Sequence, residues 1–90
     1  VWEPLKAAAN RREHGISFEL AERVLRDPWH TSRPDEHPRE ERWQTIGKPS
    51  ADSGLVLLVV HTEPRAMSGG ALVGRIISAR DATPKERRAY

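Results

Sequence analysis

The chain has 90 residues, of which 37% are hydrophobic, and its formal net charge is only +2. A chain of this length is expected to form one domain over residues 1–90, and it buries only about 60–65% of its unfolded surface, so its core is small. The absence of cysteine excludes disulfides and thiolate metal sites, and the absence of a long apolar run or a signal-peptide pattern leads us to expect a cytoplasmic protein with no membrane partner.

A first helix is predicted to begin at Pro4 and to end at Gly15. Proline suits the first helical position because it lacks the N–H that would have no acceptor there. Glycine readily adopts the left-handed conformation that commonly ends a helix. The inward face of this helix would carry Leu5, Ala8, Ala9 and Arg12, and its outward face Lys6, Asn10 and Glu13.

A second helix is predicted to begin after Ser17, which would be its N-cap. Apolar residues then recur at helical spacing and give the helix one apolar face. They are Phe18, Ala21, Val24 and Leu25. Asp27 and Pro28 would end the helix. Two short helices cannot bury their apolar faces alone, so we expect them to pack on a sheet.

Four later segments have the composition of strands. They are residues 29–33, 41–48, 55–60 and 72–80, with loops at 34–40 and 64–71. Residues 55–60 are an unbroken apolar run, which is typical of a strand covered on both faces. The last segment would pair with this run, and its Arg75 and Arg80 would place fixed positive charge at the rim of the sheet, as an anion site requires. A solvated face or a carboxylate partner would explain either arginine equally well.

A short final helix is predicted from the capping box at residues 83–86, in which Thr83 and Glu86 are the reciprocal partners. From residue 75 to residue 90 there are five Lys/Arg and two Asp/Glu, so basic character is concentrated at this end, as expected for a polyanion partner. The predicted fold is α+β: two N-terminal helices packed on an antiparallel sheet of three to four strands, followed by a short C-terminal helix.

Three stretches of the chain together resemble the BrnT family of toxins. The first comprises Trp2, Glu3, Pro4, Lys6, Asn10 and residues 14–19, the second Glu40, Glu41, Arg42 and Gly47, and the third residues 75–80 with Ala82, Glu86, Arg87 and Tyr90. They cover nearly the whole chain in the expected order. Two features depart from the family pattern: Glu3 stands where aspartate is usual, and the loop at 64–71 is longer than is typical.

The resemblance implies a RelE-like fold and a ribonuclease toxin of a type II toxin–antitoxin system, which would cleave RNA and inhibit translation. It also implies neutralisation by a BrnA-type antitoxin, which is a ribbon-helix-helix protein. Two ribbon-helix-helix chains form one DNA-reading unit, so we expect a 2:2 complex. Operator DNA would then be bound only through the antitoxin.

The expected hairpins give a first pairing register for the sheet. If both connecting loops close antiparallel hairpins, Val60 lies between Arg42 on one side and Arg75 on the other. Directly opposed residues point to the same face, so these two arginines would share a face. His61 would lie opposite Glu41 on the other face. A slip of one residue would reverse these assignments.

Metal-independent cleavage of RNA requires a base for the 2′-hydroxyl proton, stabilisation of the phosphorane charge and a proton for the leaving oxygen. Arginine suits the second task but not the first, because it stays protonated. The catalytic candidates are Arg80, Arg75 and Arg42 for charge stabilisation, with Glu41 or His61 as the base. The RNA-binding candidates are Lys6, Lys85, Arg87 and Arg88. A local hydrogen bond would explain His61 equally well.

No spacing of His, Asp and Glu in the sequence indicates a metal site, and no cofactor is expected. Two further functions fit the same residues. The arginines could contact nucleic-acid phosphates without catalysis, or the chain could serve mainly to assemble with an antitoxin. Cleavage of purified RNA would distinguish a ribonuclease from these two alternatives. Salt-dependent binding of nucleic acid without cleavage would favour the non-catalytic binder.

Overall fold

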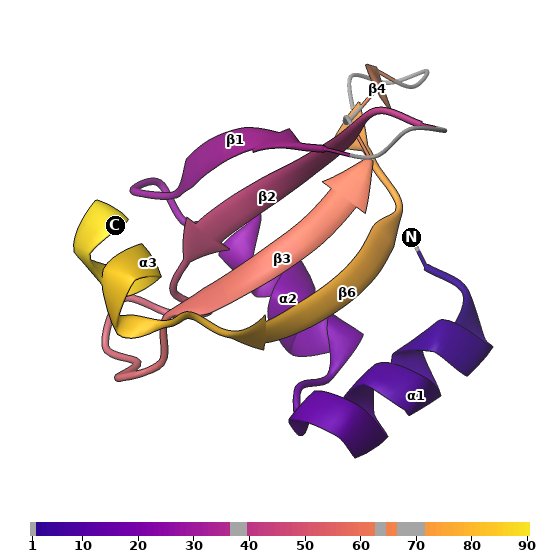
Figure 1. The fold of residues 1–90 in the computed structure, drawn as a ribbon, viewed down its shortest axis with the longest axis horizontal. Helices are drawn as coiled ribbons and strands as arrows, with labels where there is room; N and C mark the ends of the chain where they lie inside the picture. The colour runs from indigo at the N-terminus through magenta and orange to yellow at the C-terminus, as the bar shows by residue number, and fades with distance from the viewer. Residues whose placement is uncertain (1, 37–39, 63–64, 67–71) are drawn as a thin grey trace.

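The computed structural model describes residues 2–36, 40–62, 65–66 and 72–90, without the side chains of 65–66 and 72–73. Its helices are α1 (Pro4–His14), α2 (Phe18–Val24) and α3 (Pro84–Ala89), and its strands are β1 (Thr31–Asp35), β2 (Arg42–Gly47), β3 (Leu57–Thr62), β4 (Arg65–Ala66), β5 (Leu72–Val73) and β6 (Ile76–Asp81). Four strands form an antiparallel sheet in the order β1-β2-β3-β6, and β4 pairs with β5 in a separate ribbon (Figure 1). The predicted α+β fold is confirmed.

Local signals set both ends of α1 and the start of α2, as predicted, whereas α2 ends at Val24, before the predicted stop at Asp27 and Pro28. The carboxylate of Glu3 caps α1 by accepting from the backbone N–H groups of Leu5 and Lys6, each at 3.0 Å. Glutamate therefore performs the capping role at the position where the family usually has aspartate. Gly15 ends α1 in the left-handed conformation, with φ of 71°, and Ser17 caps α2.

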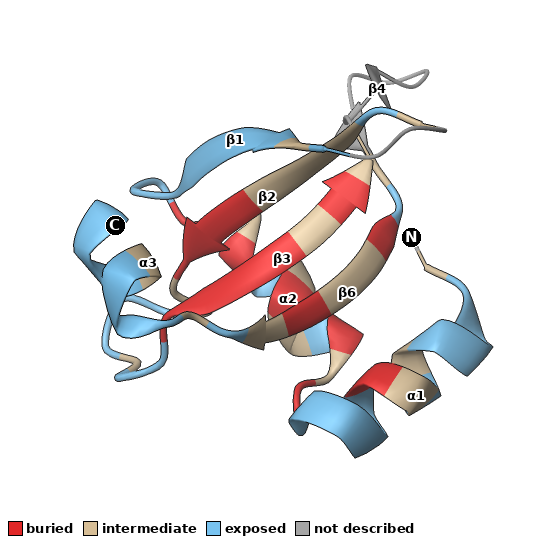
Figure 2. Cartoon of the chain, viewed as in Figure 1, coloured by how far each residue is buried: buried red, intermediate tan, exposed pale blue. Residues whose placement is uncertain are grey.

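The two faces of the sheet differ in their cover. Helix α2 packs on one face, where the larger core lies, and α1 lies along β6 at the edge of the sheet (Figures 1 and 2). This core includes Phe18, Ala21, Val24, Leu57, Val59, Ile76 and Ala79. On the opposite face, α3 lies at one end, where Tyr90 packs against the smaller cluster of Ile46, Val56 and Leu58. Because no other helix in the described residues covers this second face, we call it the open face.

Helix α1 buries a different face from the one predicted. Asn10, expected to point outward, is 6% exposed, whereas Leu5, expected to point inward, is 78% exposed. The side-chain amide of Asn10 donates to the carbonyls of Ile16 and Ala79 at 3.0 and 2.8 Å, and its oxygen accepts from the N–H of Ala79 at 3.0 Å. The polar groups along the outer edge of β6 thus determine which face of α1 turns inward.

The strand predicted over residues 72–80 is divided into two. Residues 72–73 pair with β4, and β6 begins only at Ile76. The edge strand predicted at 29–33 lies instead at Thr31–Asp35, so the predicted loop at 34–40 begins later; residues 37–39 are outside the described part of the chain. Of the loop predicted at 64–71, only residues 65–66 are described, and they form β4.

The predicted register is wrong. Val60 lies opposite Gln44 and Ser78, not between Arg42 and Arg75. The prediction assumes that each of the two connecting loops closes a simple antiparallel hairpin. In the structure the β4–β5 ribbon lies between β3 and β6 in the chain, and the β3–β6 register shifts after Val60.

Candidate functional site

Arginines from three strands project from the open face. Directly opposed residues of paired strands point to the same face. Three rows of paired residues cross the sheet on this face. The first row holds Thr31, Ile46, Leu58 and Arg80, and the second holds Arg33, Gln44, Val60 and Ser78. The third row holds Asp35, Arg42 and Thr62. Since Ile46 and Leu58 belong to the cluster beside α3, all three rows lie on the open face.

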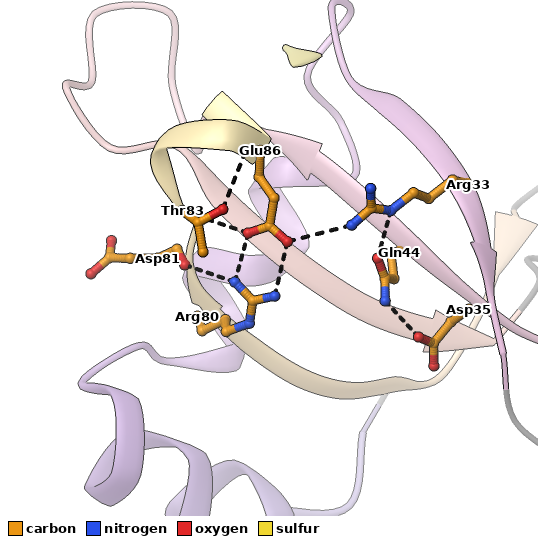
Figure 3. A network of polar contacts seen from close by, with 7 residues as sticks. All are labelled: Arg33, Asp35, Gln44, Arg80, Asp81, Thr83 and Glu86. Atoms are coloured by element: carbon orange, nitrogen blue, oxygen red, sulfur yellow. Dashed lines mark hydrogen bonds and ion pairs between the residues drawn. The ribbon is translucent and has the colours of Figure 1, made fainter. Parts of the chain in front are cut away.

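The carboxylate of Glu86 joins two of these arginines across the sheet (Figure 3). Nη1 and Nη2 of Arg80 donate to its two oxygens at 2.7 and 3.0 Å, and Nη2 of Arg33 donates at 3.4 Å. Arg80 belongs to β6 and Arg33 to β1, which are the two outer strands. Nε of Arg33 also donates to Gln44 at 2.7 Å, and the Gln44 amide donates to Asp35 at 2.5 Å. The network therefore spans the width of the sheet.

The capping box of α3 holds Glu86 in this position. The Glu86 carboxylate accepts from the backbone N–H of Thr83 at 2.9 Å, and the Thr83 hydroxyl accepts from the backbone N–H of Glu86 at 3.2 Å, as the sequence predicts. The hydrogen bonds from Arg80 are the main cause that lowers the pKa of Glu86 to about 2, and Glu86 in turn raises the pKa of Arg80. Glu86 is therefore ionised at neutral pH and is a poor proton acceptor.

A second carboxylate, that of Glu40, joins Arg42 and Arg75. Nε of Arg42 donates to one of its oxygens at 2.8 Å, and Nη2 of Arg75 donates to both, at 3.0 and 3.1 Å. The hydrogen bond from Arg42, with the charge of Arg75, lowers the pKa of Glu40. The structure thus brings Arg42 and Arg75 together through a carboxylate, and not by the direct opposition that the sequence predicts.

Glu41 lies at the edge of this second cluster. It is exposed, and it lines a hollow of about 570 Å³. The other lining residues are Pro34, Asp35, Glu36, Glu40, Arg42 and Trp43. Glu41 and Arg42 therefore line the same hollow, and Glu41 is open to solvent there.

His61 lies on the face covered by the helices and is 4% exposed. Its Nδ1 is 2.8 Å from the carbonyl of Thr62, which can only accept, so Nδ1 carries the proton. Burial lowers the pKa of His61, so the ring is neutral and Nε2 accepts from the hydroxyl of Thr45 at 2.6 Å. Both ring nitrogens are engaged, and the structure does not bring His61 to the open face.

Three of the four predicted RNA-binding cations lie together. Lys85, Arg87 and Arg88 are exposed on α3, the helix that supplies Glu86. Lys6 is exposed on α1, which lies across the molecule from α3 (Figure 1). The structure thus groups three of the predicted cations on α3 and separates Lys6 from them.

Sequence reasoning assigned no role at the site to Arg33, Gln44 or Glu40, and it identified Glu86 as a capping residue and as part of the family resemblance. A signal for Gln44 was present, since alternation along a strand places it on the same face as Arg42. The partners of the carboxylates depend on where α3 lies over the sheet. No local sequence pattern specifies that position.

The chemical groups gathered on the open face are guanidinium groups, carboxylates and an amide. Within residues 2–36, 40–62, 65–66 and 72–90, no group of three or more His, Asp or Glu side chains could hold a metal ion. The helices found in this part of the chain are too short or too polar to cross a membrane.

Comparison with known proteins agrees with the resemblance seen in the sequence. Residues 2–86 match the family model described as "Ribonuclease toxin, BrnT, of type II toxin-antitoxin system". No curated protein matches the chain. The family match covers nearly all of the chain and includes the open face with both of its carboxylate clusters. The chain belongs to the BrnT family, the ribonuclease toxins of type II toxin–antitoxin systems.

Proposed function

We propose that the open face is the active site of a cytoplasmic, metal-independent endoribonuclease that inhibits translation by cleaving RNA. One observation carries the proposal: in a chain of a ribonuclease family, four arginines gather at two carboxylates on or beside one sheet face. They are Arg33, Arg42, Arg75 and Arg80. A sheet is a rigid support, so these guanidinium groups are held ready for the charge that develops on a scissile phosphate.

Arg80 is the proposed main charge-stabilising residue. A guanidinium has five N–H donors, and in Arg80 three of them donate to Glu86 and to the carbonyl of Asp81. The other two are not engaged by any described residue, and the side chain is 38% exposed. They can therefore donate to the non-bridging oxygens of a phosphate while Glu86 stays in place. Glu86 is then a positioning residue that fixes the plane of the guanidinium.

The cluster of Glu40, Arg42 and Arg75, with the neighbouring Glu41, is proposed to supply further phosphate contacts and the base. Arg42 and Arg75 would bind the phosphate from the far end of the open face. Glu41, in the hollow beside Arg42, is the proposed base for the 2′-hydroxyl proton. Glu40 is less suited to that task because its arginine partners lower its pKa. His61 is left out of the proposed site because both of its ring nitrogens are engaged on the covered face.

The antitoxin of the system is proposed to be a BrnA-type ribbon-helix-helix protein. Its carboxylates would cover the basic surface around Arg75, Arg80, Arg87 and Arg88, where RNA phosphates otherwise bind. Two toxins with two antitoxins would form the complex, because two ribbon-helix-helix chains form one DNA-reading unit. Binding of operator DNA would belong to the antitoxin.

Incubation of the purified chain with RNA, with and without EDTA, tests the proposed reaction. Cleavage that persists in EDTA is expected, together with inhibition of a cell-free translation reaction. Loss of cleavage in EDTA that one added divalent ion restores would contradict metal independence. Salt-dependent RNA binding without cleavage would favour a non-catalytic binder, and complex formation with an antitoxin as the only activity would favour an assembly subunit.

A further inference from the structure

A second hollow, of about 610 Å³, lies at the C-terminal end of α3, where Tyr90 lines it. It is formed where the end of α2, the turn after β2 and the C-terminal residue meet. Its chemically distinctive lining residues are Arg23, Arg26, Asp27, Trp29, Lys48 and Tyr90. None of these residues belongs to the active site proposed above.

The floor of this hollow is held by Asp27. Its carboxylate, on a residue that is 9% exposed, accepts from the backbone N–H groups of Trp29 and Lys48 at 2.9 and 2.8 Å and from the hydroxyl of Tyr90 at 2.5 Å. Burial alone would raise the pKa of Asp27, but these hydrogen bonds lower it below its usual value. One buried carboxylate thus fixes three chain segments around the hollow, and its own lone pairs are already engaged.

The rim of the hollow combines exposed rings with cations. Trp29 is 78% exposed, the same fraction as Leu5, and an indole is a large apolar surface to leave in water. Nζ of Lys48 lies 5.8 Å from the centroid of the Tyr90 ring. Arg26 is paired with Glu22 at 2.9 Å, whereas Arg23 forms no ion pair with any described residue. An exposed ring that shares a hollow with two cations in no ion pair with any described residue is complementary to a nucleotide, whose base stacks and whose phosphate is anionic.

We propose that this hollow is a binding subsite for a single-stranded RNA nucleotide flanking the scissile bond, with the base stacked on Trp29 and the phosphate held by Arg23 and Lys48. The inference rests on the proposed ribonuclease function, which it extends from the cleavage site to a substrate-binding site. Helix α3 connects the two sites. Glu86 and Tyr90 are four residues apart in sequence, or about 6 Å along the helix axis, so one RNA strand can follow α3 from the arginine network to the hollow.

The test measures affinity separately from cleavage. The intact chain is titrated into a fluorescein-labelled, 2′-O-methylated oligonucleotide, which cannot be cleaved, and fluorescence anisotropy gives the Kd. Trp29→Ala should raise the Kd by about 5- to 100-fold, as the loss of one stacked base predicts, and Trp29→Phe should restore most of the affinity. In cleavage of unmodified RNA, Trp29→Ala should raise KM and leave kcat nearly unchanged. Lys48→Met should reduce the slope of log affinity against log salt by about one.

The control is Leu5→Ala, which removes an equally exposed apolar side chain from α1 and should leave the Kd and KM at wild-type values. If the wild-type chain cleaves RNA and Trp29→Ala has the same Kd and KM as the wild type, the subsite is refuted and the ribonuclease proposal stands. Weaker capture of the antitoxin with unchanged RNA affinity would assign the hollow to the partner protein and also refute the subsite. Trp29-dependent binding by a wild-type chain that never cleaves RNA would support the subsite and refute the ribonuclease proposal.

Discussion

The Glu86 side chain has two structural roles: it completes the capping box of α3, and it binds the guanidinium of Arg80. Its side chain is only 11% exposed, so its interactions are little screened by solvent. Arg80 alone would be a mobile side chain on a sheet surface. With Glu86 bound to both of its terminal nitrogens, the guanidinium has one orientation, which is what stabilisation of a developing charge requires.

Replacement of Glu86 by glutamine should remove a pH-dependent part of the stability. The pKa of this carboxyl is about 2 in the folded chain and 4.5 as its ordinary value, so the folded state favours the ionised form. Its contribution is complete above the ordinary value and is lost as the pH falls toward about 2. Urea denaturation near neutral pH should show Glu86→Gln to be less stable by on the order of 2 kcal/mol. The difference should shrink on acidification; a constant difference would contradict this assignment.

Asn10 is the polar residue on which the position of α1 depends. Replacement by alanine leaves the backbone groups of Ala79 and the carbonyl of Ile16 without their partner in a buried place. We expect Asn10→Ala to lower the free energy of unfolding by on the order of 3 kcal/mol, measured by urea denaturation. The exposed neighbour Arg11→Ala should stay within about 0.5 kcal/mol of the wild type. Equal stability of the two variants would contradict the role given to Asn10.

Helix α3 is the element that positions the candidate site. It has six residues, none of them buried, so its attachment depends on its capping box and on the contacts of Glu86 and Tyr90. An isolated helix of this length is unstable in water. Its place over the sheet is therefore sensitive to single side chains at its two ends.

Loss of the α3 cap should be measurable on its own. Thr83→Ala removes the hydroxyl that accepts from the backbone N–H of Glu86 and should cost about 1 kcal/mol of stability. Thr83→Ser keeps the hydroxyl and should retain most of that stability, as followed by thermal or urea denaturation. If the alanine variant is as stable as the serine variant, the cap does not hold α3.

The elements could be predicted from the sequence where one residue decides a local conformation. Pro4, Gly15, Ser17 and Thr83 each act within one turn of their own position, and the helix ends that they predict are confirmed. The register could not be predicted, because it depends on the ribbon β4–β5 and on the shift after Val60. The predicted pairing partners of Arg75 and His61 are wrong, whereas the prediction that Arg42 and His61 lie on opposite faces is confirmed.

At the scale of the whole molecule, we propose that RNA and the antitoxin compete for the same arginines. Charge reversal on α3, as Arg87→Glu with Arg88→Glu, should weaken antitoxin binding by about tenfold or more, because the proposed antitoxin carboxylates lose their partners. The matched control is Arg11→Glu with Arg12→Glu, which makes the same change of charge on α1. Binding measured by titration should be unchanged in the control. A complex with the antitoxin that still cleaves RNA at the full rate would contradict masking of the site.

The most direct test of the central claim, that the open face cleaves RNA, is the initial rate of RNA cleavage in EDTA for Arg80 variants. Removal of Arg80 alone takes from Glu86 its shortest ion pair and leaves Arg33 at 3.4 Å, so the decisive variant is Arg80→Ala with Glu86→Ala, which removes both members of the pair. Its fold is checked by circular dichroism, and Arg11→Ala serves as the control. We predict that the double variant loses about 10²–10³-fold in rate, while Arg11→Ala cleaves at the wild-type rate. A folded double variant that cleaves at the wild-type rate would place the active site elsewhere.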